Sequence, residues 1–425
     1  MTRTTTSDIP ALGKPRAVDC VSDAPADRAP RSLFITQDFP PRVGGFQSYY
    51  WGLLRTLDPE DVVILASHHP GAASFDATHP YRVVRHPRSI LLPTPALLRS
   101  ARRLIAEHDL RLVQLGQTLP NGLLGPALTR RTGLPYLVLL AGAELTLPAA
   151  LPGSGAAVRH VLGRAALLLT VSGYTAAAAE RVVKGRVPVA VLRPTLDLDG
   201  PDRDGAAPAA SAPPALTAAQ QRARNGGSLV VCVGRLVPRK GQDRLIDALA
   251  LLVPRYPGLQ LALVGSGRLA AALERRARRL GVEDRVHLLG ALPHSQVAEW
   301  LAAADVFASP CRVRWGGLEV EGFGIVFAEA AAAGLPVLAG RSGGAPEAVA
   351  EGDTGIVVNG SSASEVAAGL ERMLRLSPAG RRSMGGRGRE LARERHAPAV
   401  VGRRYRELLW RAAGAETRGD SRGHN

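Results

Sequence analysis

Short apolar runs alternate with helical stretches in two long series, and this alternation restricts the chain to few folds. The first series begins at Ser32 with SLFIT and continues through VVILA, RLVQL and YLVLL. The second begins at Ser228 with SLVVCVG and ends with LPVLAG and GIVV. Such alternation is typical of βα units around a parallel sheet. The sequence therefore predicts an α/β protein with two doubly wound, Rossmann-like domains.

A segment rich in Ala, Pro and Gly separates the two series at residues 200–227. This composition suits an interdomain connector. The carboxyl ends of both sheets would then face a shared cleft, where open α/β sheets bind ligands. The expected parts are a disordered leader at 1–30, a first domain at 31–195, a linker at 196–228, a second domain at 229–395, a C-terminal helix at 396–412 that crosses back to the first domain, and a polar tail at 413–425.

Composition and charge narrow the class of partner. Of the 425 residues 46% are hydrophobic, and 53 Lys and Arg against 37 Asp and Glu give a formal charge of +16. A basic chain suits nucleic acid, an anionic membrane surface or phosphorylated substrates. Aromatic residues make up only 4% of the chain, and no nucleic-acid-binding module is present. We therefore expect no nucleic-acid partner.

Cysteine usage and hydropathy indicate a cytoplasmic chain. Cys20, Cys232 and Cys311 are widely spaced and form no C-x-x-C pair, so neither a disulfide framework nor a zinc site is predicted. The N-terminus has no signal-peptide core, and no apolar stretch reaches the roughly 18 residues of a membrane span. Any membrane contact would be peripheral, at the inner face of the cell membrane.

The segment GRLVPRKGQDRL at 234–245 follows an apolar strand pattern and leads into a helix. It places Arg235 and Lys240 on a loop at the carboxyl end of that strand. Two such cations can hold a diphosphate, one as a planar fork and one as a point charge. The alternative is a pair of solvated surface charges at a turn.

The segment GGLEVEGFGIVFAEAAAAGLPVLAG at 316–340 carries two carboxylates, Glu321 and Glu329, eight residues apart. The apolar pattern predicts a helix that starts near Gly324. Backbone N–H groups at such a start can receive phosphate or sugar oxygens. The two carboxylates could then contact different parts of one extended ligand. The alternative is an acidic cap and a surface carboxylate.

Other glycine turns are weaker signals. Gly44 and Gly45 follow the first strand, at a turn that suits phosphate. VGSGRLA, which contains Gly265, fits a relaxed dinucleotide fingerprint, but it lies in the second βα unit of its domain and not in the first. SGGAPEAV at 342–349 is a glycine-rich turn before a helix, which could bind phosphate or simply pack between a strand and a helix. LDLDG at 196–200 contains an Asp-x-Asp pair that could bind a metal ion, but its place at the start of the linker favours a turn.

A basic amphipathic pattern covers residues 95–107. Arg99, Arg102 and Arg103 lie on one face of the predicted helix, and leucines and Ile105 lie on another. Such a helix can rest on anionic lipid. The alternative is a helix that packs its apolar face on a sheet.

Taken together, GRLVPRKG, the glycine turn at 265–267 and EGFGIVFAE resemble the retaining nucleotide-sugar glycosyltransferases of family 4, which have the GT-B fold. The resemblance extends over about residues 31–412. The stretches FPPRVGGFQSY, LPTPALL and PCRVRWGGLEVEGFGIV are most similar to the actinobacterial GDP-mannose-dependent phosphatidylinositol monomannoside mannosyltransferases. The resemblance implies a retaining hexosyltransferase with GDP-mannose as donor and a glycolipid or small glycoside as acceptor.

The resemblance also implies roles for individual residues. Arg235 and Lys240 would bind the donor diphosphate, Glu321 would face the transferred sugar, and Glu329 would bind the ribose hydroxyls. Such enzymes generally need no metal, so neither a metal nor another cofactor is expected. The positions implied to contact the donor are Gly44, Gly45, Gly265, Phe323, Gly324, Ile325 and Glu329.

One departure from the family pattern concerns the first domain. Where the family has His-Gly-x-Glu, with the His touching the sugar, this chain reads Ala141-Gly142-Ala143-Glu144. Ala141 has no side-chain hydrogen-bond donor. This departure keeps two alternatives open: a soluble family 4 transferase that uses a UDP-sugar or another nucleotide-sugar on a secondary metabolite or envelope glycan, and a catalytically silent sugar-nucleotide-binding protein. A third alternative, an NAD-dependent oxidoreductase, rests only on VGSGRLA.

Overall fold

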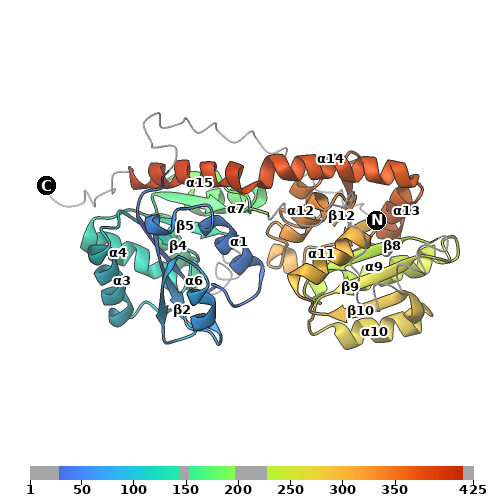
Figure 1. Ribbon diagram of the computed structural model, residues 1–425, viewed down its shortest axis with the longest axis horizontal. Coiled ribbons are helices and arrows are strands. Elements are labelled where there is room, and N and C mark those ends of the chain that lie inside the picture. Colours follow the sequence, from blue (N-terminus) through green and yellow to red (C-terminus); the bar gives the residue numbers. More distant parts are fainter. Residues whose placement is uncertain (1–27, 143–144, 146–152, 197–226, 415–425) are drawn as a thin grey trace, which may run out of the picture.

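The computed structural model describes residues 28–142, 145, 153–196 and 227–414, which form two α/β halves side by side (Figure 1). Each half is built on one parallel sheet. The first sheet has the strand order β3-β2-β1-β4-β5-β6-β7, and the second has the order β10-β9-β8-β11-β12-β13. The fold predicted from the sequence, two doubly wound sheets, is confirmed.

The elements of the first half alternate as the sequence predicts. Its strands are β1 (Ser32–Thr36), β2 (Val62–Ser67), β3 (Arg82–His86), β4 (Leu112–Leu115), β5 (Tyr136–Leu140), β6 (Leu167–Thr170) and β7 (Val189–Val191). Its helices are α1 (Gly45–Leu54), α2 (Ala72–Ala77), α3 (Pro95–Glu107), α4 (Leu124–Thr132), α6 (Ser154–Leu162) and α7 (Gly173–Val183).

The second half repeats the pattern and ends in two long helices. Its strands are β8 (Leu229–Val233), β9 (Gln260–Val264), β10 (Val286–Gly290), β11 (Val306–Ser309), β12 (Val337–Gly340) and β13 (Gly355–Val358). Its helices are α9 (Gln242–Leu252), α10 (Ala270–Arg279), α11 (His294–Ala303), α12 (Ile325–Ala332), α13 (Ala363–Leu374), α14 (Pro378–His396) and α15 (Pro398–Ala413).

Both sheets change direction of winding beside their first strand. In the first half, Ile35 of β1 pairs with Leu65 of β2 on one side and with Leu115 of β4 on the other. All residues of these three strands are buried, which explains why their apolar runs are continuous and not alternating. The carboxyl ends of β1 and β4 therefore lie together at a topological switch point, the usual ligand position in such sheets.

The C-terminal helices join the two halves. Helix α14 packs on α12 of the second half, and α15 continues along α1, β4 and β5 of the first. Figure 1 shows these helices as one long element above both halves. Inside the first half, the buried Tyr405 hydroxyl of α15 donates a hydrogen bond to Gln114 Oε1 of β4.

The sequence predicts a disordered leader at residues 1–30, and the structure describes the last three residues of that range. Residues 1–27 lie outside the described part, but residues 28–30 belong to the first half. The Ala29 amide donates to Asp61 Oδ2 at 3.0 Å, and Arg28 pairs with the other oxygen of this buried carboxylate at 2.9 Å. A buried carboxylate requires such partners, so Asp61 holds the chain in place. Residues 197–226 of the predicted linker (196–228) and residues 415–425 of the predicted tail (413–425) also lie outside the described residues.

Candidate functional site

Glu321 and Lys240 form a buried ion pair in the second half. Lys240 Nζ lies 3.0 Å from Glu321 Oε2, and only 8% and 9% of these two side chains are exposed. Lys240 ends a short 3₁₀ turn, Pro238–Lys240, on the loop between β8 and α9. Glu321 lies on the loop between β11 and α12. Two of the three residues predicted to be catalytic are thus in direct contact.

A second cation at this pair is Arg239, which the sequence analysis did not single out. Arg239 Nη1 lies 3.7 Å from Glu321 Oε2. The Arg239 carbonyl also accepts a hydrogen bond from the Arg312 amide at 2.8 Å, which holds the two loops together. Arg235, the third predicted catalytic residue, lies on the same loop with an exposed side chain. Its carbonyl accepts a hydrogen bond from Gln242 at 3.0 Å.

The electrostatics of this cluster keep both partners charged. Burial alone would raise the pKa of Glu321, but Lys240 and Arg239 outweigh it and leave that pKa below its ordinary value. Burial alone would lower the pKa of Lys240, but the Glu321 carboxylate outweighs it and raises that pKa. Glu321 with two cations leaves a net positive charge, which suits an anionic ligand.

The predicted helix start after Glu321 is present. Gly324 has a φ of 78° and caps α12, whose first residue is Ile325. Phe323 is buried, with its ring 5.4 Å from that of His396. Glu329 lies one turn into α12, where burial raises the pKa of its carboxyl although His294 and Lys240 oppose the shift. Glu329 therefore lies close enough to Lys240 for their charges to interact.

The glycine turn after β9 packs against the cation-bearing loop. Gly265 has a φ of 135°, and a side chain there would collide with the Gly234 carbonyl. A Cβ at Gly267 would lie 2.5 Å from the Leu236 carbonyl oxygen. These glycines are therefore needed for close packing of two loops, a reason that holds without a dinucleotide.

In the first half, the predicted pair Gly44 and Gly45 begins α1. Gly44 is its N-cap, and the Gly44 carbonyl accepts a hydrogen bond from the Ser48 amide at 3.0 Å. Gly45 has open space where a side chain would stand. The contact of both glycines with a diphosphate stays a prediction.

Ala141, where the family has His, lies at the contact between the two halves. A Cβ at Gly322 would collide with the Ala141 carbonyl oxygen, and one at Gly142 would lie 3.4 Å from the Gly322 backbone. The turn after β5 therefore contacts the residue next to Glu321. Ala143 and Glu144 of the same motif lie outside the described residues.

A polar cluster that the sequence analysis missed lies at the switch point of the first sheet. Asp38, just beyond β1, accepts hydrogen bonds from Gln47 at 2.7 Å and from Gln117, just beyond β4. Thr118 Oγ1, Gln117 Oε1 and both polar atoms of the Asn121 amide are buried without a hydrogen-bond partner among the described residues. Unpaired buried polar atoms are costly and often mark functional sites. The signal in the sequence is LGQTLPN, directly after an apolar strand run.

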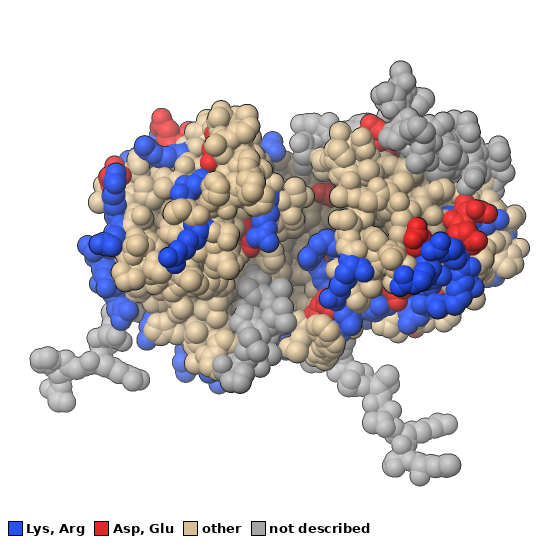
Figure 2. All heavy atoms as spheres, turned by 90° about the horizontal axis from the view of Figure 1, so that it is seen from below, with Lys and Arg blue, Asp and Glu red and all other residues tan. Residues whose placement is uncertain are grey.

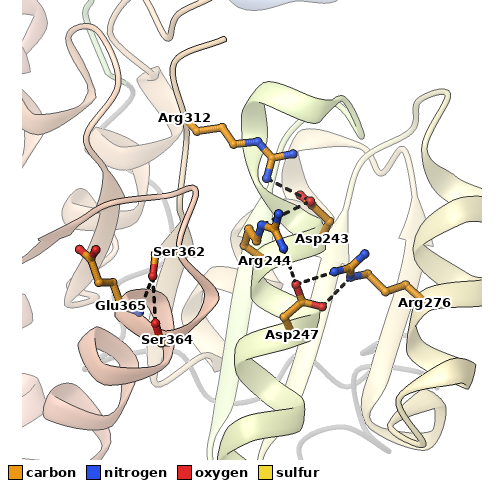
Figure 3. Close-up of polar contacts among 8 residues, drawn as sticks. All are labelled: Asp243, Arg244, Asp247, Arg276, Arg312, Ser362, Ser364 and Glu365. Atoms are coloured by element: carbon orange, nitrogen blue, oxygen red, sulfur yellow. Dashed lines mark hydrogen bonds and ion pairs between the residues drawn. The ribbon is translucent and has the colours of Figure 1, made fainter. Parts of the chain in front are cut away.

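The loop that carries Glu321 is anchored to α9 by a network of ion pairs (Figure 3). Arg312 Nη1 lies 3.0 Å from Asp243 Oδ2. One turn further along α9, Asp247 pairs with Arg244 at 2.9 Å and with Arg276 of α10 at 2.5 Å. These contacts fix α9 between the Glu321 loop and α10, and they position the site without being part of it.

Helix α3 uses its apolar face for packing. Leu97, Ala101, Leu104 and Ile105 are buried, and α3 contacts β1 and α4. The three arginines predicted to contact a membrane, Arg99, Arg102 and Arg103, are exposed. Figure 2 shows Lys and Arg side chains gathered on both halves, on either side of the groove between them.

Two further properties concern metals and membranes. Among the described residues no group of three His, Cys, Asp or Glu side chains could hold a metal ion; Asp197 and Asp199 of LDLDG lie outside that part. Within the same residues, no helix is long and apolar enough to cross a bilayer.

Comparison with known proteins places the chain in a family. Residues 216–391 match the family described as "Glycosyl transferases group 1". The chain is 39% identical to a GDP-mannose-dependent alpha-(1-6)-phosphatidylinositol monomannoside mannosyltransferase of Mycolicibacterium smegmatis, covering 89% of this chain and 97% of the relative. It is 36% identical to the GDP-mannose-dependent monoacylated alpha-(1-6)-phosphatidylinositol monomannoside mannosyltransferase of Corynebacterium glutamicum, with the same coverage.

Among solved structures, Anabaena HepE in complex with UDP superposes with a TM-score of 0.73 at 20% identity, covering 89% of this chain and 99% of that one. The two doubly wound sheets are those of the GT-B fold. The chain belongs to the group 1 glycosyltransferases.

Proposed function

We propose that this chain transfers mannose from GDP-mannose to a phosphatidylinositol mannoside, with retention of configuration. One observation carries the proposal: the Glu321–Lys240–Arg239 cluster lies at the start of α12 in a chain 39% identical to a relative named for that reaction. Retention rests on the resemblance of the motifs to family 4.

The second half supplies the donor chemistry in this proposal. Lys240 and Arg239 neutralise the charge that grows on the diphosphate as the glycosidic bond breaks, and exposed Arg235 closes on it from solvent. Donors placed in advance at a developing charge are typically worth about a hundredfold to a thousandfold in rate. Amides at Gly324 and Ile325 add the positive end of α12, and Glu329 accepts hydrogen bonds from the ribose hydroxyls.

The first half supplies the acceptor side. The unpaired amide of Asn121, with Gln117 and Asp38, offers both donors and acceptors at the switch point. A polyol such as a mannose or inositol ring presents hydroxyls that pair with such groups. The apolar face of α3 packs on β1 and α4 and is not free to enter a bilayer. The exposed arginines of α3 would therefore attract anionic lipid through their charge alone.

A donor panel tests this function. Purified full-length chain is incubated with GDP-mannose, UDP-glucose or UDP-N-acetylglucosamine and a lipid extract, and products are identified by mass spectrometry. A new mannolipid with GDP-mannose only, lost in Glu321→Gln, supports the proposal. Product with a UDP-sugar supports the soluble-transferase alternative instead. No product with any donor, together with GDP-dependent thermal stabilisation, supports a silent binding protein, which the Ala141 departure favours. Stabilisation by NAD alone contradicts the transferase assignment.

Vesicle binding tests the membrane part separately. The Arg99/Arg102/Arg103→Glu variant should co-sediment less than wild type with vesicles of phosphatidylinositol and phosphatidylcholine. Equal sedimentation removes α3 from the proposal and leaves the transfer reaction unaffected.

A further inference from the structure

Glu347, in the 3₁₀ turn Ala345–Ala348 of the second half, binds the start of α7 in the first half. Its two carboxylate oxygens accept hydrogen bonds from the amides of Gly173 and Tyr174, each at 2.8 Å. The first amides of a helix have no partner within the helix, and the positive end of its dipole favours a carboxylate. Arg193, also in the first half, faces the same carboxylate: burial lowers the Arg193 pKa, and Glu347 opposes that shift.

The loop before Glu347 also holds the backbone of Glu321. Ser342 Oγ accepts a hydrogen bond from the Glu321 amide at 3.2 Å, and the Gly344 amide donates to the Glu321 carbonyl at 2.9 Å. A side chain at Gly343 or Gly344 would collide with the carbonyls of Glu321 or Gly322. The loop therefore has one fixed position relative to Glu321.

A third contact completes the connection from the first half. The Ser172 hydroxyl, at the N-cap of α7, donates to the Gly322 carbonyl at 2.8 Å. Gly322 is also the residue that lies against the Ala141 carbonyl. The start of α7, the Glu347 turn and the Glu321 loop thus form one hydrogen-bonded group across the two halves.

We propose that Glu347 is a positioning residue: by binding the start of α7, it holds the two halves at the spacing that sets Glu321 opposite the turn at Ala141. Both partners of the carboxylate come from the other half of the molecule. The contact therefore stabilises only arrangements in which the halves are together, and its loss favours more open ones. Ligands that need both halves then bind less tightly, in proportion to the closed fraction.

The experiment compares full-length variants in solution. Glu347→Ala removes both acceptors. Gly173→Pro removes one donor at the first position of α7, where proline suits a helix. Gly173→Ala keeps the amide, and its Cβ would lie 3.4 Å from Glu347 oxygens, so it is the matched control. Glu365→Ala is a second control. The Glu365 carboxylate accepts a hydrogen bond from the Asn359 amide within its own half, and the Glu365 amide, which the substitution keeps, donates to Ser362 Oγ; Figure 3 shows Glu365 beside Ser362.

Small-angle X-ray scattering, with and without GDP, reports the spacing of the halves without any donor or acceptor turnover. We expect a larger radius of gyration for Glu347→Ala and Gly173→Pro than for wild type and both controls. In the double variant the two changes should not add, since they break the same contact. A wild-type radius in both folded variants overturns the proposal, and so does a full sum of the two effects.

Kinetics provide a second readout, which rests on the proposed function. Loss of a charge-assisted hydrogen bond pair should lower kcat/KM for the acceptor by about tenfold to a hundredfold, with circular dichroism unchanged. Glu347→Gln, which keeps one acceptor oxygen, should recover part of the loss and also serves if Glu347→Ala does not fold. If Glu347→Ala is expanded but the wild type transfers no mannose, the positioning role stands and only the proposed transfer reaction is contradicted. If Glu347→Ala is compact and fully active, only the positioning role is contradicted.

Discussion

Lys240 Nζ lies 3.0 Å from Glu321 Oε2 in a site where both side chains are less than a tenth exposed. Burying two charges is costly, and their attraction offsets that cost only while both are present. The stability of the second half therefore depends on two residues, Lys240 and Glu321, that the motifs predict to be catalytic.

The first prediction separates these two roles of the pair. Lys240→Met should lower the unfolding free energy by about 3 to 5 kcal/mol, because it leaves a buried carboxylate with one cation less. Lys240→Met/Glu321→Gln should recover part of this loss, since the buried carboxylate goes together with its lysine, although Arg239 then loses the same carboxylate. Mannosyl transfer should fall by about a hundredfold or more in both variants. Urea unfolding and initial rates measure the two effects, and recovery of activity in the double variant would contradict a role in chemistry.

A second prediction distinguishes Arg239 from Arg235. Arg235 is exposed, so Arg235→Ala should change the unfolding free energy by less than about 0.5 kcal/mol while it raises KM for the donor. Arg239 pairs with Glu321 at 3.7 Å, so Arg239→Ala should lower both stability and donor affinity. Calorimetric titration of each variant with GDP measures affinity. Unchanged GDP binding in Arg235→Ala would remove it from the proposed diphosphate site.

The sequence predicts the fold well because its signal is local and repeated. Continuous apolar runs indicate buried parallel strands, and the stretch expected as a helix at 95–107 is α3 with the same bounds. Residues 121–132, in contrast, form a 3₁₀ turn, Asn121–Leu123, followed by α4. What the sequence could not give is the strand order, which depends on contacts between distant segments.

The same limit explains the residues that were missed. The loop sequence RLVPRKG contains three cations, Arg235, Arg239 and Lys240. Only the folded loop shows that Arg239 lies against Glu321 and that Arg235 is exposed to solvent. Gln117 and Asp38 come together because β4 pairs with β1, across a long stretch of intervening chain. The sequence presents Glu347 only as part of a packing or phosphate turn, because its partner Gly173 belongs to the other half.

A third prediction concerns the polar cluster of the first half. An unpaired buried amide destabilises a fold, so Asn121→Leu should leave the melting temperature equal to or above that of wild type. If the amide binds acceptor hydroxyls, the same variant should lower kcat/KM for the acceptor by about tenfold and leave KM for GDP-mannose unchanged. Gln260→Leu, which removes a buried amide that is hydrogen-bonded in the second half, is the matched control. It should lose stability and keep its acceptor KM.

The last prediction concerns acid stability at the junction of the halves. His396 Nδ1 lies 2.8 Å from the Pro194 carbonyl, in a site also faced by the Phe323 ring and by Arg193 and Arg395. Burial lowers the pKa of His396 from 6.5 to about 4. The hydrogen bond to the Pro194 carbonyl opposes this shift, and the charges of Arg193 and Arg395 add to it. The unfolded chain therefore takes up this proton first as pH falls. Stability from the neutral ring is complete above pH ~6.5 and is lost progressively toward pH ~4, by up to ~3 kcal/mol.

The variant His396→Gln keeps a donor for the Pro194 carbonyl and cannot titrate. Its unfolding free energy should be lower than that of wild type at pH 7, where the native ring packs better, and the difference should shrink or reverse by pH 4.5. Urea titrations at pH 7, 6, 5 and 4.5 measure both curves, and other titrating groups contribute equally to each. Parallel curves over this range would show that His396 takes up no proton on unfolding, in contradiction to a buried neutral ring at the junction.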